Sequence, residues 1–365
     1  MRPIQFIALL SLLMGVLVIF GIPSERIPTL AANPRIQLLT DPPLQQIRPF
    51  EAEATSEQYP VKFVLQALDQ QGDLLQLARI HLVLQTPERN IWLPTDFPWA
   101  EGSQLLELEA LNPVQFEQML PIRGSYRLQI TVKSPAESFQ ENLDFFVTEA
   151  PIKYVFLGIL VIVLFGVGIL GAWIIGDPAA GDGLSESVRL LLSGAAGVAI
   201  VVLLVINFKA GWAETHPAEM PISPTKQAPV MQAEGRELSL EGDPSAVVGQ
   251  PLALTVKVRD LQTGQSLPDQ DLEIRSTQLE HGWTAFAYQG SADLTWQQHF
   301  FDGAPHRIAA RIPSSPLQVS QIIEVEGIAP PLSIRLIVMS YLLGILTLGM
   351  GAGFWIRRAL LRSAN

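Results

Sequence analysis

The stretch Leu252-Ala253-Leu254-Thr255-Val256-Lys257-Val258-Arg259 decides the fold class of this chain. Its large apolar side chains alternate with small or polar ones, so one face of an extended strand is buried and the other meets solvent. The turn Asp260-Leu261-Gln262-Thr263-Gly264 follows, and a second alternating stretch, Leu272-Glu273-Ile274-Arg275, comes after it. A strand, a turn and a strand in this order predict antiparallel β-structure.

The same pattern occurs earlier in the chain. Residues 79–84 and 126–133 alternate, and Leu143, Phe145 and Val147 mark a third strand of this kind. Short strands separated by turn residues are typical of an antiparallel sandwich.

The two regions also align with each other. Placing the turn 69–72 on the turn 260–264 brings the flanking strands into step with one residue of slack. Further along, Arg127 and Arg307 each lie in an alternating strand that follows an apolar pair and a glycine. We interpret this as an internal repeat of one β-rich unit.

Four apolar runs contain no Asp, Glu, Lys or Arg: Phe6–Ile22, Tyr154–Gly176, Leu190–Phe208 and Leu336–Ile356. The last three reach or approach the roughly 20 residues that a helix needs to cross a bilayer, so we expect transmembrane helices. The first follows Arg2 and precedes the small pair Ala31-Ala32, which fits either a cleaved signal peptide or a retained anchor. The similarity of the two halves favours the anchor.

These patterns divide the chain as follows: a signal peptide or anchor (1–22), an external β-domain (23–150), a transmembrane helix (154–176), a cytoplasmic loop (177–189), a transmembrane helix (190–208), a Pro-rich linker (209–235), a second external β-domain (236–331), a transmembrane helix (332–356) and a cytoplasmic tail (357–365). Arg357, Arg358 and Arg362 place the C-terminus in the cytoplasm, which puts both β-domains outside.

The charge and cysteine content restrict the function. The net charge is −11 and basic clusters are lacking, which argues against nucleic acid as a partner. The chain has no cysteine, so disulfides, thiol catalysis and thiolate metal sites are excluded. We therefore expect a multi-pass protein of the bacterial inner (cytoplasmic) membrane, with two extracytoplasmic domains that are held together by their hydrophobic cores.

Two stretches resemble bacterial immunoglobulin-like envelope domains. Residues 249–274 are similar to their first hairpin, and Gly124-Ser125-Tyr126-Arg127-Leu128 is similar to their penultimate strand. Within that group the chain resembles the membrane-anchored FixH/YtkA-like type, over about a quarter of its length. The resemblance implies two immunoglobulin-like antiparallel β-sandwiches, each flanked by membrane-spanning helices, and an association with copper-oxidase assembly. The doubled layout departs from the single anchor of that type.

The sequence carries no catalytic signature. No GxSxG, HExxH, Walker or GxGxxG pattern occurs, so we predict no enzyme, no catalytic residue and no cofactor-binding residue.

Copper is the one cofactor to consider. His281, His299 and His306 fall in loops and strand ends of the second domain, and imidazole suits copper. His216, Met220 and Met231 could add ligands. Their spacing does not constrain them, so ordinary loop and strand positions explain these residues equally well, and the metal site stays unknown. His81 shares a strand with Ile80 and is expected to face solvent.

Two aromatic segments, 91–99 and 281–288, occupy similar places in the two domains. Rigid aromatic side chains are typical of binding surfaces, and they also occur in loops that fold back over a core. Both interpretations stay open.

Small residues recur at four-residue spacing in the apolar runs: Gly168, Ala172 and Gly176; Ser193 and Gly197; Gly349 and Gly353. This spacing allows helices to approach closely, either within the chain or with a partner. The function that we predict is a non-enzymatic scaffold or assembly factor in the lipid bilayer, which holds a membrane-protein partner. The alternative is a periplasmic copper-handling protein.

Overall fold

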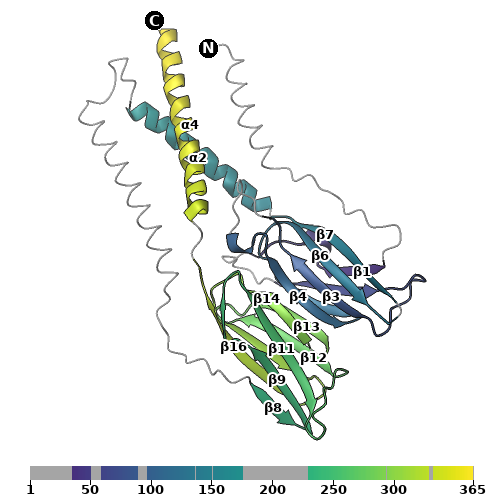
Figure 1. The fold of residues 1–365 in the computed structure, drawn as a ribbon. Helices are drawn as coiled ribbons and strands as arrows, with labels where there is room; N and C mark the ends of the chain where they lie inside the picture. Colours follow the sequence, from purple (N-terminus) through teal and green to yellow (C-terminus); the bar gives the residue numbers. More distant parts are fainter. Residues whose placement is uncertain are drawn as a thin grey trace. The chain divides into compact units, whose positions relative to one another are not determined.

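The computed structural model of the chain describes residues 35–50, 59–88, 97–135, 137–149, 151–175, 229–292, 294–328 and 332–364. These residues form two compact units (Figure 1). The helices α2 (Pro151–Ile175) and α4 (Leu332–Ala364) make one unit, and all of the described strands make the other. The predicted segments 1–22, 177–189 and 190–208 and most of the predicted linker lie outside the described residues.

The first half of the β-unit, residues 35–149, contains seven of the described strands: β1 (Ile36–Asp41), β2 (Val61–Ala67), β3 (Arg79–Gln85), β4 (Gln104–Leu111), β5 (Val114–Gln118), β6 (Gly124–Lys133) and β7 (Ser138–Val147). Short 3-10 turns, η1 (Leu44–Gln46) and η2 (Pro98–Ala100), lie between them.

The second half, residues 229–328, contains nine of the described strands: β8 (Val230–Ala233), β9 (Arg236–Gly242), β10 (Ser245–Val247), β11 (Pro251–Asp260), β12 (Asp271–Gln278), β13 (Thr284–Ser291), β14 (Leu294–His299), β15 (His306–Arg311) and β16 (Gln318–Glu326). β8 falls inside the predicted linker 209–235. It forms because Glu234 and Gly235, both with positive φ, turn the chain back and pair β8 with β9.

The predicted alternation is confirmed by burial. In β3 the side chains of Ile80, Leu82 and Leu84 are fully buried, and in β6 those at 126, 128, 130 and 132 are buried too. In β11 the even-numbered side chains from Leu252 to Val258 are buried in the same way. One face of each strand therefore builds the core, as the period of two requires.

Both sheets run through both halves of the chain. One sheet has the order β1-β2-β5-β13-β12-β15-β16-β10, and the other has the order β7-β6-β3-β4-β14-β11-β9-β8. β5 pairs with β13 and β4 pairs with β14, each time antiparallel. The two predicted domains, 23–150 and 236–331, thus share both of their sheets. This pairing covers four strand edges that separate sandwiches would leave open.

The two junctions have the same register. Phe116 faces Tyr288 in one sheet, and Leu108 faces Trp296 in the other. An offset of 180 relates the two halves, so residue 108 corresponds to 288 and residue 116 corresponds to 296. The pair 108–296 of one junction therefore corresponds to the pair 116–288 of the other. The ladders β3–β4 and β12–β13 even share an irregularity at equivalent places, after Leu84 and after Ser276.

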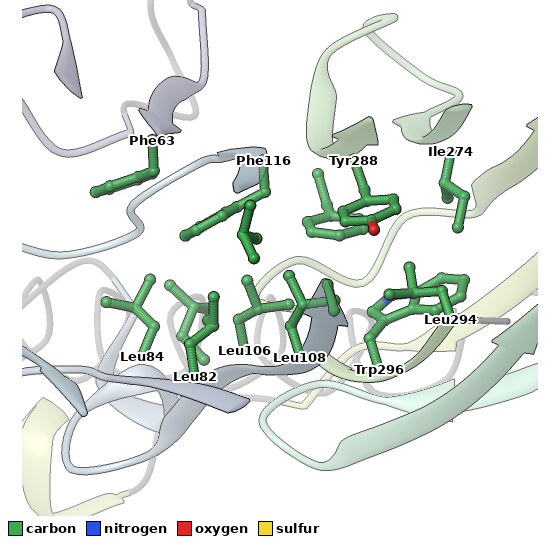
Figure 2. Close-up of a cluster of buried hydrophobic side chains, with 14 of the residues drawn as sticks. Phe63, Leu82, Leu84, Leu106, Leu108, Phe116, Ile274, Tyr288, Leu294 and Trp296 are labelled. Carbon is green, nitrogen blue, oxygen red and sulfur yellow. The ribbon is translucent and has the colours of Figure 1, made fainter. Parts of the chain in front are cut away.

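The core is continuous across these junctions. Figure 2 shows Phe63 and Phe116 in a row with Tyr288 and Ile274, above leucines of the first half and Leu294 and Trp296 of the second. All of these side chains belong to one cluster of buried residues. The two halves therefore form a single hydrophobic unit.

The helices pack through the small residues that the sequence singled out. A Cβ added at Gly349 would collide with the backbone of Phe165, and one added at Gly168 would collide with that of Leu346. Gly353 lies against Ala172. Phe165 lies against Gly349, and Ile169 and Ala172 lie against Gly353, so the two helices cross while running in the same general direction. Intramolecular packing is confirmed for these positions, whereas 176, 193 and 197 lie outside the described residues.

Among the described residues, two helices are long and apolar enough to cross a membrane. Their candidate spans are Lys153–Trp173 and Ile334–Leu360. α4 continues to Ala364, so helical structure extends through most of the predicted tail, 357–365.

Candidate functional site

Aromatic side chains from both halves gather at the end of the sheets where β7 and β16 finish. The ring of Phe50 lies 4.5 Å from that of Trp283 and 5.3 Å from that of Phe301, measured between centroids. Phe97 lies 5.4 Å from Phe301, and Trp99 Nε1 donates a hydrogen bond of 2.8 Å to the Phe301 carbonyl. This aromatic cluster ties loops of the first half to a loop of the second.

The cluster decides between the two interpretations of the aromatic segments, as far as they are described. Phe97 is buried, and Trp99 and Trp283 are half-buried against the core. Gly249, with φ of +76°, allows the backbone to pass close to Trp99. These loops fold over the core and are not free hot spots. Residues 91–96, which include Trp92, lie outside the described residues.

The first half contains a buried tyrosine at the start of β6. The Tyr126 hydroxyl donates to the Ile122 carbonyl at 2.7 Å and accepts from the Ile122 amide at 3.1 Å. Because the ring is fully buried, the pKa of Tyr126 is raised above its ordinary value. The neutral Tyr126 hydroxyl thus links the start of β6 to the preceding loop by two hydrogen bonds.

The equivalent position in the second half is His306, at the start of β15, since 126 plus 180 is 306. Its Nδ1 lies 2.8 Å from the Ala304 carbonyl, which can only accept, so Nδ1 carries a proton. Its Nε2 lies 3.5 Å from Oδ1 of Asp302. Asp302 is equivalent to Ile122 by the same offset.

Burial governs the charge of this pair. It raises the pKa of Asp302 to about 7 and lowers the pKa of His306 to about 4. Near neutral pH the His306 ring is therefore neutral and the Asp302 carboxyl is partly protonated. The side chain of His306 is only 2% exposed, so no substrate can reach it. We interpret the two residues as a buried polar contact within the core of the second half.

The second half contains further buried polar side chains. Gln278 forms a hydrogen bond with Asp302, and its Nε2 lies 3.4 Å from His281 Nδ1. Burial lowers the pKa of His299 to about 4. Ser276 is fully buried where the first half has Leu84. Two of the buried polar residues, Ser276 and Asp302, thus take places that Leu84 and Ile122 occupy in the first half.

Sequence reasoning missed Asp302 and Gln278. The internal alignment could have found Asp302. Aligning Arg127 with Arg307 also aligns Ile122 with Asp302 and Tyr126 with His306. A buried polar residue whose counterpart in the other half is apolar indicates a candidate site.

Two of the candidate copper ligands, His281 and His306, have other contacts in the structure. His306 is engaged by Ala304 and Asp302, and the ring of His281 stacks on Trp283 at 4.4 Å. Among the described residues, no three side chains of His, Cys, Asp or Glu are grouped to hold a metal ion. Met231 lies on β8, where its sulfur accepts from the Gln318 amide, whereas His216 and Met220 lie outside the described residues. The copper alternative therefore stays a prediction.

His81, expected to face solvent, is half-buried on the outer face of β3. Its Nε2 lies 2.8 Å from Glu107 Oε1, and this contact lowers the pKa of Glu107. It is a surface pair on one sheet.

No protein-family model matches the chain, and no curated protein is similar to it in sequence. Among solved structures, the D0-D1 domain of intimin is 8% identical, with 75% of this chain and 92% of that chain covered and a TM-score of 0.19. Domains 4 and 5 of the S-layer protein SbsC are 10% identical (81% and 98% covered, TM-score 0.17). MtrC from Shewanella baltica is 9% identical (80% and 70% covered, TM-score 0.18). At these TM-scores the likenesses carry no argument, and the fold rests on the strand order itself.

Proposed function

We propose that this chain is a non-enzymatic scaffold or assembly factor of the bacterial inner membrane, which holds a membrane-protein partner. The observation that carries the proposal is the pairing of β5 with β13 and of β4 with β14. Shared sheets and one core make the two halves a rigid platform, and rigid platforms suit the positioning of partners.

The two halves of the platform are two immunoglobulin-like sandwiches that arose by duplication of one unit. The offset of 180 between the junction ladders supports this origin. The helix crossing supports this origin independently. An offset of 181 makes Phe165 correspond to Leu346 and Gly168 to Gly349. The contact of Gly168 with Leu346 therefore corresponds to the contact of Gly349 with Phe165. Equivalent helices that follow equivalent halves are the expected product of such a duplication.

The two crossing helices support a multi-pass membrane arrangement. α2 and α4 each follow a β-rich half and run in the same direction, so the chain has to cross the bilayer once more between them. The apolar run 190–208 supplies that crossing. Arg357 and Arg358 at the end of α4 favour a cytoplasmic C-terminus and extracytoplasmic sheets.

The arrangement can be tested because the natural chain has no cysteine. Single cysteines at Asp73 and at Asn365 would be treated with a membrane-impermeant maleimide on intact spheroplasts. We expect labelling at 73 and none at 365 until the membrane is opened. The opposite pattern would overturn the orientation.

The scaffold role is tested by purifying the tagged full-length protein in a mild detergent and identifying what accompanies it by mass spectrometry. We expect a stoichiometric membrane protein. A variant at the helix crossing, Gly349→Val, should lose the partner if an intact helix pair is needed, and Gly344→Val, at a position with open space, is the matched control. A chain that purifies alone under several mild conditions would contradict the scaffold role.

A further inference from the structure

The two junctions of the β-unit are images of each other under exchange of the halves. Residues 108 and 116 of the first half correspond to 288 and 296 of the second, and the ladders join 108 to 296 and 116 to 288. An interface in which residue i contacts j and j contacts i is the kind that two identical subunits form. By the register of the backbone alone, a first half could therefore pair with a second copy of itself.

The buried side chains at the junctions differ in size between the halves. The first half supplies Leu108 and Phe116, whereas the second half supplies Tyr288 and Trp296 at the corresponding positions. Figure 2 shows Phe116 beside Tyr288 and Leu108 beside Trp296, as the ladders require. Each junction thus joins a larger ring of the second half to a smaller side chain of the first.

Pairing of like halves would disturb this fit in opposite ways. Two first halves would place Leu108 beside Phe116 at both junctions, so the core would lose the volume of one Tyr and one Trp and contain space. Two second halves would place Tyr288 beside Trp296 at both junctions and overfill the same core. Pairing of unlike halves avoids both effects.

The second half is further adapted to its tyrosine. Gly290 lies two residues beyond Tyr288 on the same face of β13, and a Cβ added to this glycine would collide with the Tyr288 hydroxyl. The first half has Ala110 at the corresponding position, two residues beyond the smaller Leu108. Both residues of the second half therefore differ from their counterparts in a way that fits the larger ring.

The outer faces of the junctions favour the same pairing more weakly. Glu107 faces Gln297 in one ladder, and Glu117 faces an alanine in the other. In a pair of first halves, Glu107 would face Glu117 at both junctions, and like charges directly opposite each other are destabilising. Lys62, the other ladder partner of Glu117, and His81, which contacts Glu107, reduce this repulsion but do not separate the two carboxylates.

We infer that the junctions form a selective pairing surface, at which β4 and β5 of the first half fit the second half of the chain and not a second copy of the first half. The first half is synthesised first, and both of its strand edges are open until the second half follows. Without selection, the open edges of neighbouring chains would pair with each other. The inference does not depend on the scaffold role, because it concerns how the platform itself assembles.

The test exchanges the junction residues within the full-length chain. The first variant reproduces the core of two first halves, with Tyr288→Leu, Gly290→Ala and Trp296→Phe. The second variant reproduces the core of two second halves, with Leu108→Tyr, Ala110→Gly and Phe116→Trp. The third variant carries all six changes, so each ladder again joins a larger side chain to a smaller one, with the halves exchanged.

Thermal unfolding in detergent, followed by circular dichroism, measures the three variants. We expect each one-sided variant to lower the midpoint by roughly 6 °C or more. The sixfold variant should lose less than either of them, because its junction residues again complement each other. A loss in the sixfold variant that equals or exceeds the smaller of the one-sided losses would overturn the inference, since the residues would then act locally and not as a pair.

A milder change tests the outer face and decides the inference if the core variants do not fold. Gln297→Glu places a carboxylate opposite Glu107 and should lower the midpoint by about 1–3 °C, less in about 1 M salt. Adding Glu107→Gln should restore the midpoint. Ser320→Glu, whose ladder partner is Ala309, is the matched control and should leave it unchanged. No loss with Gln297→Glu, or a loss that Glu107→Gln does not recover, would contradict selection by the outer face.

Discussion

Replacing Asp302 with Asn should stabilise the protein, and the gain should depend on pH. Asp302 is largely buried beside His306, and burial raises its pKa from 3.8 to about 7. A raised pKa in the folded state means that stability is complete below pH 3.8 and is lost as the pH rises towards 7. Above pH 7 the folded protein holds a buried carboxylate. An Asn at this position carries no charge and can still donate to the free Nε2 of His306.

The size of the gain follows from the two pKa values. The interval from 3.8 to about 7, at about 1.36 kcal/mol per pH unit, corresponds to about 4 kcal/mol at pH 8. At pH 5 only the part between 3.8 and 5 applies, which leaves less than about 2 kcal/mol. With roughly 2–4 °C per kcal/mol for a unit of this size, the midpoint should rise by about 8–16 °C at pH 8.

Thermal unfolding of the full-length protein in detergent, followed by tryptophan fluorescence, would measure this at pH 5 and pH 8. Asp269→Asn, at an exposed turn, is the control and should shift the midpoint by the equivalent of less than about 0.5 kcal/mol. A gain of equal size at both pH values, or no gain at pH 8, would refute the argument that burial of the carboxylate governs this site.

Three further changes test other parts of the structure. Tyr126→Phe removes both hydrogen bonds of a buried hydroxyl and should cost about 1–3 kcal/mol equally at pH 5 and pH 8, in the same fluorescence assay. Trp99→Ala breaks the hydrogen bond to Phe301 and empties part of the aromatic cluster, so we expect a loss of about 3 kcal/mol and the release of the loop to limited proteolysis. Gly349→Val should lower the detergent melting temperature by several degrees, whereas Gly344→Val should not, and equal effects would contradict the observed crossing.

The sequence predicts the strands well because a strand with one buried face has apolar side chains at every second position. The residues of β3, β6 and β11 that alternate in the sequence are the ones that alternate in burial. The internal alignment is also informative, since Arg127 and Arg307 occupy equivalent ladder positions opposite Gln85 and Thr277. Small residues at four-residue spacing in the same way predicted the close approach of α2 and α4.

The sharing of the sheets could not be predicted in this way. The residues of β4 and β5 that pair with the other half alternate just as they would at a solvent-exposed edge, because edge pairing uses backbone groups and leaves the side-chain pattern unchanged.

Because the two halves are equivalent, a residue in one half can be compared with its counterpart in the other half of the same molecule. Residues at the junctions are constrained twice, because each strand pairs with its own half and with the other. The outer faces and the strand-end loops carry no such double constraint and are free to differ. Asp302, which takes the place of Ile122, lies in a loop of this kind. Exchanging Asp302 for Ile, its counterpart in the first half, should therefore remove the part of the pH dependence of stability that Asp302 causes.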